Sequence, residues 1–81
     1  MRVYQKDIIN AIYNKKVWGG SNVVVRTENN VTEVFFYGNR IAVINHNTKS
    51  ATFDNCGYNN ASTTARINAC KMYCDNYGYT Y

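Results

Sequence analysis

The sequence predicts an α+β domain in which a three- or four-stranded antiparallel sheet is flanked by an N-terminal and a C-terminal helix. Two amphipathic stretches begin and end the chain. Between them, short runs of β-branched and aromatic residues alternate with turn signals. The chain has 81 residues, and a domain of this size buries only about 60% of its surface on folding. We therefore expect a single domain over residues 1–81, with one thin core and no deep substrate cleft.

The N-terminal helix is predicted at about residues 4–16. Apolar residues recur there with a spacing near 3.6, at Tyr4, Ile8, Ala11 and Ile12. Glycine readily adopts the left-handed conformation that ends a helix. The pair Gly19-Gly20 is therefore the predicted stop signal.

The strands are predicted at about residues 21–27, 31–37, 40–46 and 50–54. Glu28, Asn29 and Asn30 separate the first two strands and indicate a hairpin. Gly38-Asn39 suits a two-residue turn that needs positive φ. The last strand has the weakest pattern, and it decides whether the sheet has three or four strands.

The C-terminal helix is predicted at about residues 62–76, with Asn60, Ser62 or Thr63 as its N-cap. Ile67, Cys70 and Cys74 share one stripe, and cysteines on such a stripe are usually small buried hydrophobic residues. A metal site is the alternative, and it would require four ligands to converge. The only such set would be Cys56, Cys70, Cys74 and His46, and the chain has no CxxC pair. We therefore expect core thiols and no metal.

Composition gives little specificity about function. The net charge is +4, but the basic residues are scattered, as on an ordinary solvated surface. No apolar run approaches the roughly 18 residues of a membrane span, and the first ten residues contain no secretory signal pattern. Three cysteines cannot all pair within the chain, which favours reduced thiols in a reducing cytoplasm.

Catalysis has little support in the sequence. His46 is the only histidine, and nothing places it beside a cysteine as a catalytic base. A single histidine at a strand end is usually an ordinary surface residue. The five carboxylates are spread over different predicted elements, and no phosphate-binding motif is present. We therefore predict a protein that is not an enzyme and has no cofactor.

The start of the C-terminal helix is one candidate binding site. Thr63, Thr64 and Arg66 crowd a first turn whose free amides and dipole favour an anion. The alternative is a structural role, in which Arg66 bonds Asp54 or a backbone carbonyl and anchors the preceding loop. We favour the structural role, since isolated surface anion sites are rarer.

Exposed aromatic and basic residues are the other binding candidates. Tyr77, Tyr79 and Tyr81 alternate, so an extended tail would place three rings on one face. Such a face could stack bases or bind a protein; a short edge strand packed on the domain is equally compatible. Trp18 and Arg40 complete the candidates, and burial under a loop is the structural alternative for Trp18.

The order helix–strands–helix is also that of the double-stranded-RNA-binding domain. Those domains carry a lysine-rich start of the second helix and a histidine in the first strand–strand loop. Here the helix begins Ser62-Thr63-Thr64-Ala65-Arg66, and the loop is Glu28-Asn29-Asn30. The order of the elements agrees while the motifs differ, so this is an analogy of fold.

Two stretches, YGNRIAVI at 37–44 and CGYNNASTTARINA at 56–69, resemble small phage-encoded proteins of uncharacterised families. The similarity is a Gly-Asn-x-Ile-Ala strand and a Cys-Gly-aromatic loop that leads into a Thr-Thr-x-x-Arg-Ile-Asn-Ala helix. The resemblance implies a phage accessory protein in the host cytoplasm that binds and inhibits a host complex, such as a CRISPR effector. The alternatives are a nucleic-acid-binding module and a homo-oligomeric structural phage component.

Overall fold

The computed structural model describes residues 3–20 and 22–81. Helix α1 (Val3–Asn14) begins the fold and helix α2 (Ala61–Tyr77) follows the last strand. Between them lie β1 (Trp18–Gly20), β2 (Val23–Glu28), β3 (Val31–Phe36), β4 (Asn39–Asn45) and β5 (Ser50–Phe53). The predicted α+β class is confirmed: along the chain, an N-terminal helix is followed by an antiparallel sheet and then by a C-terminal helix.

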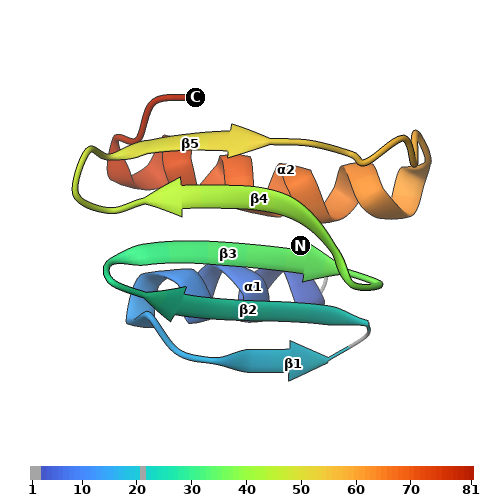
Figure 1. Cartoon of the computed structure of the whole chain (residues 1–81), viewed down its shortest axis with the longest axis horizontal. Helices are drawn as coiled ribbons and strands as arrows, with labels where there is room; N and C mark the ends of the chain where they lie inside the picture. Colours follow the sequence, from blue (N-terminus) through green and yellow to red (C-terminus); the bar gives the residue numbers. More distant parts are fainter. Residues whose placement is uncertain (1–2, 21) are drawn as a thin grey trace.

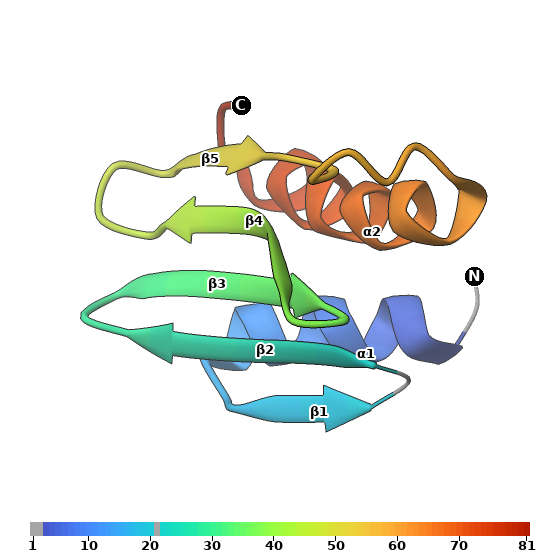
Figure 2. The same ribbon diagram turned by 45° about the vertical axis from the view of Figure 1, so that its right-hand side comes forward.

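The five strands form one antiparallel sheet in the order β1-β2-β3-β4-β5, so neighbours in sequence are neighbours in space. Both helices cover the same face of this sheet, α1 behind β2 and β3 and α2 behind β4 and β5 (Figures 1 and 2). The two helices also pack against each other. The opposite face of the sheet carries no helix, and we call it the open face.

Alternation along the strands explains why one face is covered. In β2, Val23 and Val25 are buried while Val24 and Arg26 are exposed. Successive side chains of a strand point to opposite faces, so Val23 and Val25 face the helices, whereas Val24 and Arg26 face solvent. The helical side of the core includes Ile8 and Ile12 of α1 together with Ile67 and Cys70 of α2.

Two hairpin turns fix the register of the central strands. Asn29 and Asn30, with φ of 52° and 64°, turn β2 into β3, and asparagine is among the residues that tolerate this geometry best. The next turn is formed by Tyr37 and Gly38, one residue earlier than the predicted Gly38-Asn39 pair, because Phe36 already pairs with Asn39. Ile41 is then bulged, since Phe35 pairs with Arg40 and Val34 with Ala42.

The N-terminal part of the sheet corrects two expectations. Helix α1 ends at Asn14, where Lys15 takes a φ of 54° and the Lys16 amide donates to the Ala11 carbonyl at 3.0 Å. Gly19 and Gly20 therefore do not stop the helix; they lie in β1, which gives a fifth strand paired with β2. Glycine is uncommon in strands, but its permissive backbone can adopt the extended conformation when a neighbouring strand pairs with it. Ser21, the predicted start of a strand, and the side chain of Tyr4 lie outside the described residues.

The C-terminal residues are not an extended tail with three rings on one face. Tyr77 is the last residue of α2, and Gly78, with φ 74°, ends the helix in the left-handed conformation. The chain then turns back to β5, where Thr80 forms a parallel bridge with Ser50. Glycine at this position requires no side-chain strain, which explains why the direction of the chain can reverse here.

His46 is also placed differently from its expected surface position. It is only 8% exposed, with Nε2 2.6 Å from the Thr32 hydroxyl and Nδ1 2.6 Å from the Tyr79 hydroxyl. The Tyr73 hydroxyl donates to Tyr79 at 3.3 Å. These residues form what we call the tyrosine cluster: His46, Tyr73, Tyr77, Tyr79 and Tyr13, whose ring lies 5.0 Å from that of Tyr77.

Candidate binding groove

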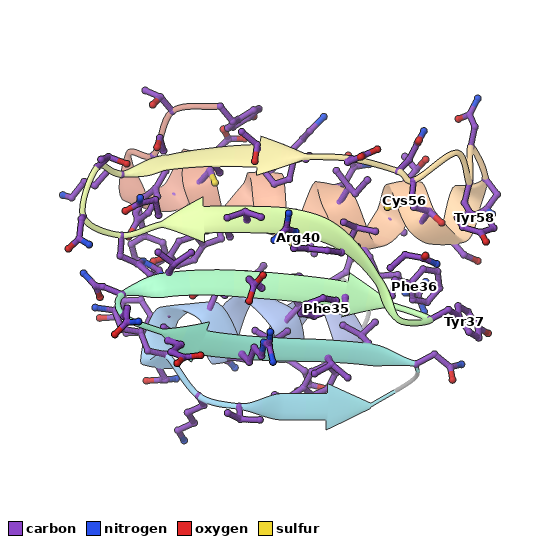
Figure 3. The ribbon with its side chains drawn as sticks, in the orientation of Figure 1. Phe35, Phe36, Tyr37, Arg40, Cys56 and Tyr58 are labelled. Carbon is purple, nitrogen blue, oxygen red and sulfur yellow. The ribbon has the colours of Figure 1, made fainter. Side chains whose placement is uncertain are left out.

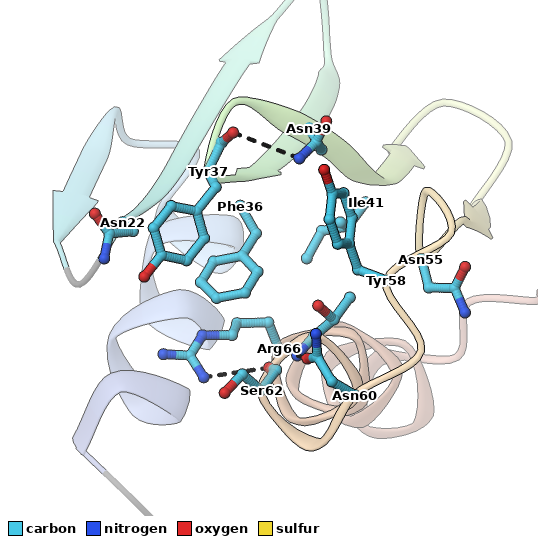
Figure 4. Close-up of a pocket in the computed structure, with 11 residues that line it drawn as sticks. Asn22, Phe36, Tyr37, Asn39, Ile41, Asn55, Tyr58, Asn60, Ser62 and Arg66 are labelled. Atoms are coloured by element: carbon cyan, nitrogen blue, oxygen red, sulfur yellow. Dashed lines mark hydrogen bonds between the residues drawn. The ribbon is translucent and has the colours of Figure 1, made fainter.

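A groove of about 730 Å³ opens between the β3–β4 turn and the loop that leads into α2. Its volume lies within the range of ordinary ligand sites, roughly 300–1,000 Å³. Figure 4 shows the turn on one side and the loop with the start of α2 on the other. The groove is lined by Asn22, Phe36, Tyr37, Asn39, Ile41, Asn55, Tyr58, Asn60, Ser62, Thr63 and Arg66.

The lining of the groove is apolar at its base and polar at its rim. Phe36, Ile41 and Thr63 are buried, and they form the base. Tyr37 and Tyr58 are 68% and 53% exposed, and their rings flank the opening from the turn and from the loop (Figure 4). The rim carries the carboxamides, which can both donate and accept hydrogen bonds. This combination suits a partner with an apolar group surrounded by neutral polar groups.

Local hydrogen bonds hold the loop of residues 54–60 in shape. The Asp54 carboxylate accepts from the Cys56 amide at 2.8 Å, and the Asn55 carboxamide oxygen accepts from the Gly57 amide at 3.0 Å. The Tyr58 amide donates to the Asn55 carbonyl at 2.9 Å. Such Asx turns are the usual reason for Asp and Asn in tight loops. Tyr58 is therefore presented on an ordered loop, which reduces the entropy lost on binding.

Tyr37 occupies an unfavourable backbone conformation at the opening of the groove. Its φ is 51°, a region in which bulky side chains are uncommon and which turns normally fill with Asn or Gly. Its ring centroid lies 4.7 Å from that of Phe36, yet most of the side chain meets solvent. Backbone strain at an exposed aromatic residue is a physical reason to look for function there.

Arg66 is the cation of the groove lining, and it makes contacts within the domain. Its guanidinium lies 4.6 Å from the centre of the Phe36 ring, and one nitrogen donates to the Ser62 carbonyl at 3.2 Å. The expected bond to a backbone carbonyl is therefore present, but it is to the residue one turn earlier in α2. Asp54, the other expected partner, accepts the Cys56 amide instead.

The other residues predicted at the start of α2 have separate positions. Asn60 is the N-cap, and its side chain accepts from the Thr63 amide at 2.9 Å. Thr63 is buried, contrary to the expected exposed helix start, whereas Thr64 is exposed. Thr63 faces the core because it is one turn before Ile67 on the buried stripe of α2. The structure therefore separates these threonines rather than presenting them together.

Arg40 and Trp18 lie outside the groove. Arg40 is on the open face, where Nη1 is 3.0 Å from Glu33, and Arg26 contacts the same carboxylate at 3.1 Å. Hydrogen bonding to Arg40, above all, lowers the pKa of Glu33, which keeps one negative charge between the two arginines. Figure 3 shows Arg40 beside Phe35 on this face. Trp18 is partly buried on β1 and packs against the core.

The three C-terminal tyrosines are divided between different neighbours. Tyr77 contacts Tyr13 and Tyr73, Tyr79 bonds His46, and Tyr81 lies 5.3 Å from the Phe53 ring and donates to Asp75 at 2.9 Å. The rings therefore stabilise the end of the molecule remote from the groove. They do not form one platform.

The cysteines of α2 are core residues, as predicted. Cys70 and Cys74 are fully buried, and burial raises the pKa of Cys70 to about 12 and that of Cys74 to about 11. Cys56 is exposed on the loop of residues 54–60 and donates to the Arg40 carbonyl at 3.3 Å. Within residues 3–20 and 22–81, no group of three His, Cys, Asp or Glu side chains is arranged to hold a metal ion.

Sequence reasoning missed Tyr37, Tyr58 and the four asparagines of the groove. One signal was available, because a tyrosine before glycine in a two-residue turn departs from the preferred Asn-Gly pair. The convergence of residue 37 and residues 55–60 was not available, since it depends on the meander returning the loop beside the β3–β4 turn (Figure 3).

The fold and the groove thus define a small α+β protein with a tyrosine-flanked groove whose lining is mostly uncharged. Residues 1–80 match the family model described as Kyanoviridae Gp96 protein. The chain belongs to this family of bacteriophage proteins, which confirms the resemblance to phage proteins. No curated protein and no solved structure matches the chain significantly. Among the described residues, no helix is both long and apolar enough to span a membrane.

Proposed function

We propose that this protein is a non-enzymatic phage accessory protein that binds a host protein complex through the groove and the two tyrosines beside it. The observation that carries the proposal is Tyr37, a largely exposed ring held at positive φ on the rim of the groove. A turn selected for stability alone would place Asn there. The exposed tyrosine is consistent with selection for contact with a partner.

The chemistry of the groove favours a protein partner over a polyanion. Its lining combines tyrosine, asparagine and serine, the residues with which antibody loops recognise proteins. Tyrosine brings a large contact area at small entropic cost, and carboxamides adapt to either a donor or an acceptor. Among the described residues, Arg66 is the single cation that lines the groove, whereas phosphate recognition depends on several.

The target that we propose is a defence complex of the host, such as a CRISPR effector. Membership in a phage protein family supports this choice, since a small phage protein can act by occupying a surface of host machinery. The test is to express the protein in a host whose CRISPR system targets a second phage and to count plaques. Restored plaque formation is the expected result, and plaque numbers equal to those of an empty vector would exclude this target.

A matched pair of surface variants tests the binding surface itself. Tyr37→Asn combined with Tyr58→Ser removes both rings of the groove opening, and Tyr81→Ser removes one that is similarly exposed on the opposite end of the molecule. A tagged chain is used to capture partners from host lysate with and without nuclease. We expect a nuclease-resistant partner that the double variant loses and Tyr81→Ser retains. Equal capture by all three chains would contradict the role of the groove.

A nucleic-acid-binding module is the second candidate, and the open face favours it. There Arg26 and Arg40 flank Phe35, and the Arg26 guanidinium lies 5.2 Å from the ring centre. Glu33 offsets part of their charge. Salt distinguishes the two functions, because phosphate binding weakens steeply with ionic strength while an aromatic protein interface weakens little.

A further inference from the structure

The two edges of the sheet are treated differently by the chain. At β5, the C-terminal residues cover part of the edge: the Ala51 amide donates to the Thr80 carbonyl at 2.8 Å, and the Thr80 amide donates to the Lys49 carbonyl at 2.9 Å. At the other edge, β1 is the terminal strand of the sheet, and β2 is its one neighbour among the described strands. An edge strand presents backbone groups that can pair with a further strand.

Apart from its short length of three residues, strand β1 contains none of the devices that usually protect an edge. Its residues, Trp-Gly-Gly, carry no charge and no proline, and its register against β2 is free of bulges. Val17, immediately before it, is 79% exposed, and Val24, the partner of Gly19, is also exposed. Two exposed apolar side chains therefore lie beside this uncharged edge strand.

We propose that β1 pairs with β1 of a second copy of this chain, antiparallel and about a two-fold axis near Gly19. In such an isologous contact each residue meets its counterpart across the axis, so the surface must be complementary to itself. Pairing Gly19 with Gly19 of the second copy places Trp18 opposite Gly20, a large side chain against none. On the open face, the two Val24 side chains then lie on the same side of the joined sheet, each one strand away from the paired β1 strands.

The helix side of the edge is also self-complementary. A hollow of about 380 Å³ lies between α1 and β1, lined by Asp7, Asn10, Ala11, Asn14, Lys16, Val17 and Trp18. Helix α1 and β1 run in opposite directions (Figure 1), so Asp7 lies toward the end of β1 and Lys16 precedes its start. An antiparallel second copy brings its Lys16 to the end of the hollow that Asp7 lines. Two opposite-charge pairs related by the axis result.

Gly19 provides a clean way to test the pairing. A Cβ added there would meet only the Val23 carbonyl, at an ordinary 3.8 Å, so a side chain at this position leaves the monomer undisturbed. Gly20 is unsuitable, since its Cβ would lie 3.1 Å from the Trp18 ring. Like charges directly opposite each other oppose strand pairing, and opposite charges favour it.

The experiment is sedimentation velocity over a concentration series of the full chain. We expect the wild type to shift from monomer to dimer as concentration rises, and Gly19→Glu and Gly19→Lys each to remain monomeric. An equimolar mixture of these two variants should form a dimer again. Thr52→Glu, a charge on an exposed residue of β5, should behave as the wild type, and circular dichroism should show all variants folded.

Three results would overturn the pairing. The first is a wild type that stays monomeric at the highest concentration reached. The second is a dimer that persists in Gly19→Glu, since that dimer would use another surface. The third is a host protein that the wild type captures and Gly19→Glu loses, which would assign the edge to a foreign strand. None of these bears on the groove, whose variants lie at Tyr37 and Tyr58.

Discussion

The groove and the tyrosine cluster both contain tyrosines, and the rings have opposite surroundings in the two regions. In the tyrosine cluster, Tyr73 and Tyr79 are held by ring contacts and by a hydrogen bond to each other, and Tyr79 also bonds His46. Beside the groove, Tyr37 and Tyr58 leave most of their surface in solvent. A large number of tyrosines therefore does not by itself indicate an interface. The role of each ring depends on whether it packs against neighbours or stays exposed.

Deleting residues 77–81 is expected to have the largest effect on the stability of the tyrosine cluster. Tyr79 and Thr80 link α2 to His46 and β5, so removing them opens the core beside Tyr73. We expect a loss of about 2 kcal/mol or more in the free energy of unfolding, because a partly buried aromatic ring and its hydrogen bond to His46 are both removed. Urea denaturation measures it, and Tyr81→Ala is the control with a small effect. An unchanged melting temperature would return these tyrosines to the interface candidates.

The next largest effect is expected from the thiols of α2. Cys70→Ala removes a fully buried sulfur beside the sheet, and we expect a loss of about 1 kcal/mol or more through packing. Cys56→Ala, on the exposed loop, is the control. Because burial raises the pKa of Cys70 to about 12, a thiol reagent at neutral pH should modify Cys56 alone in the folded protein. Melting on addition of a chelator would contradict the packing role.

A pH titration tests the tyrosine cluster through His46. Burial, together with nearby Lys15, lowers the pKa of His46 below its ordinary value of 6.5. The unfolded chain then binds more protons than the folded one, so stability is full above pH 6.5 and falls as pH drops below it. The slope is at most about 1.4 kcal/mol per pH unit for one proton. His46→Gln should remove this slope, which thermal melts between pH 7 and pH 5 would reveal.

The smallest expected change in stability is at Tyr37. Its direction should be opposite to that of the tyrosine cluster, where substitutions destabilise the fold. Tyr37→Asn creates an Asn-Gly turn, which relieves the strain at φ 51°. We expect stability to be unchanged or raised by up to about 1 kcal/mol, while binding to the host partner is lost. Thermal melting and the capture assay measure the two effects. A clear loss of stability would mean that Tyr37 serves packing against Phe36.

Local patterns predicted much of the fold, and long-range contacts decided the rest. The stripe Ile67, Cys70 and Cys74 identified the buried side of α2 because a helical period is a local property. Strand β1 was not predicted, because Gly19 and Gly20 acquire their extended backbone only by pairing with β2. His46 appeared to be a surface residue because Thr32 and Tyr79, its partners, are 14 and 33 residues away in the sequence.

The order of the strands has a consequence for how the chain folds. Every strand pairs with its neighbour in sequence, so each hairpin closes a short loop at low entropic cost. The contact between α1 and α2 instead joins the two ends of the chain, and it closes the longest loop in the molecule. We therefore expect the central hairpins to form early and the helix–helix contact to form late. Substitutions between the helices should mainly accelerate unfolding, whereas those in the β2–β3 hairpin should slow folding.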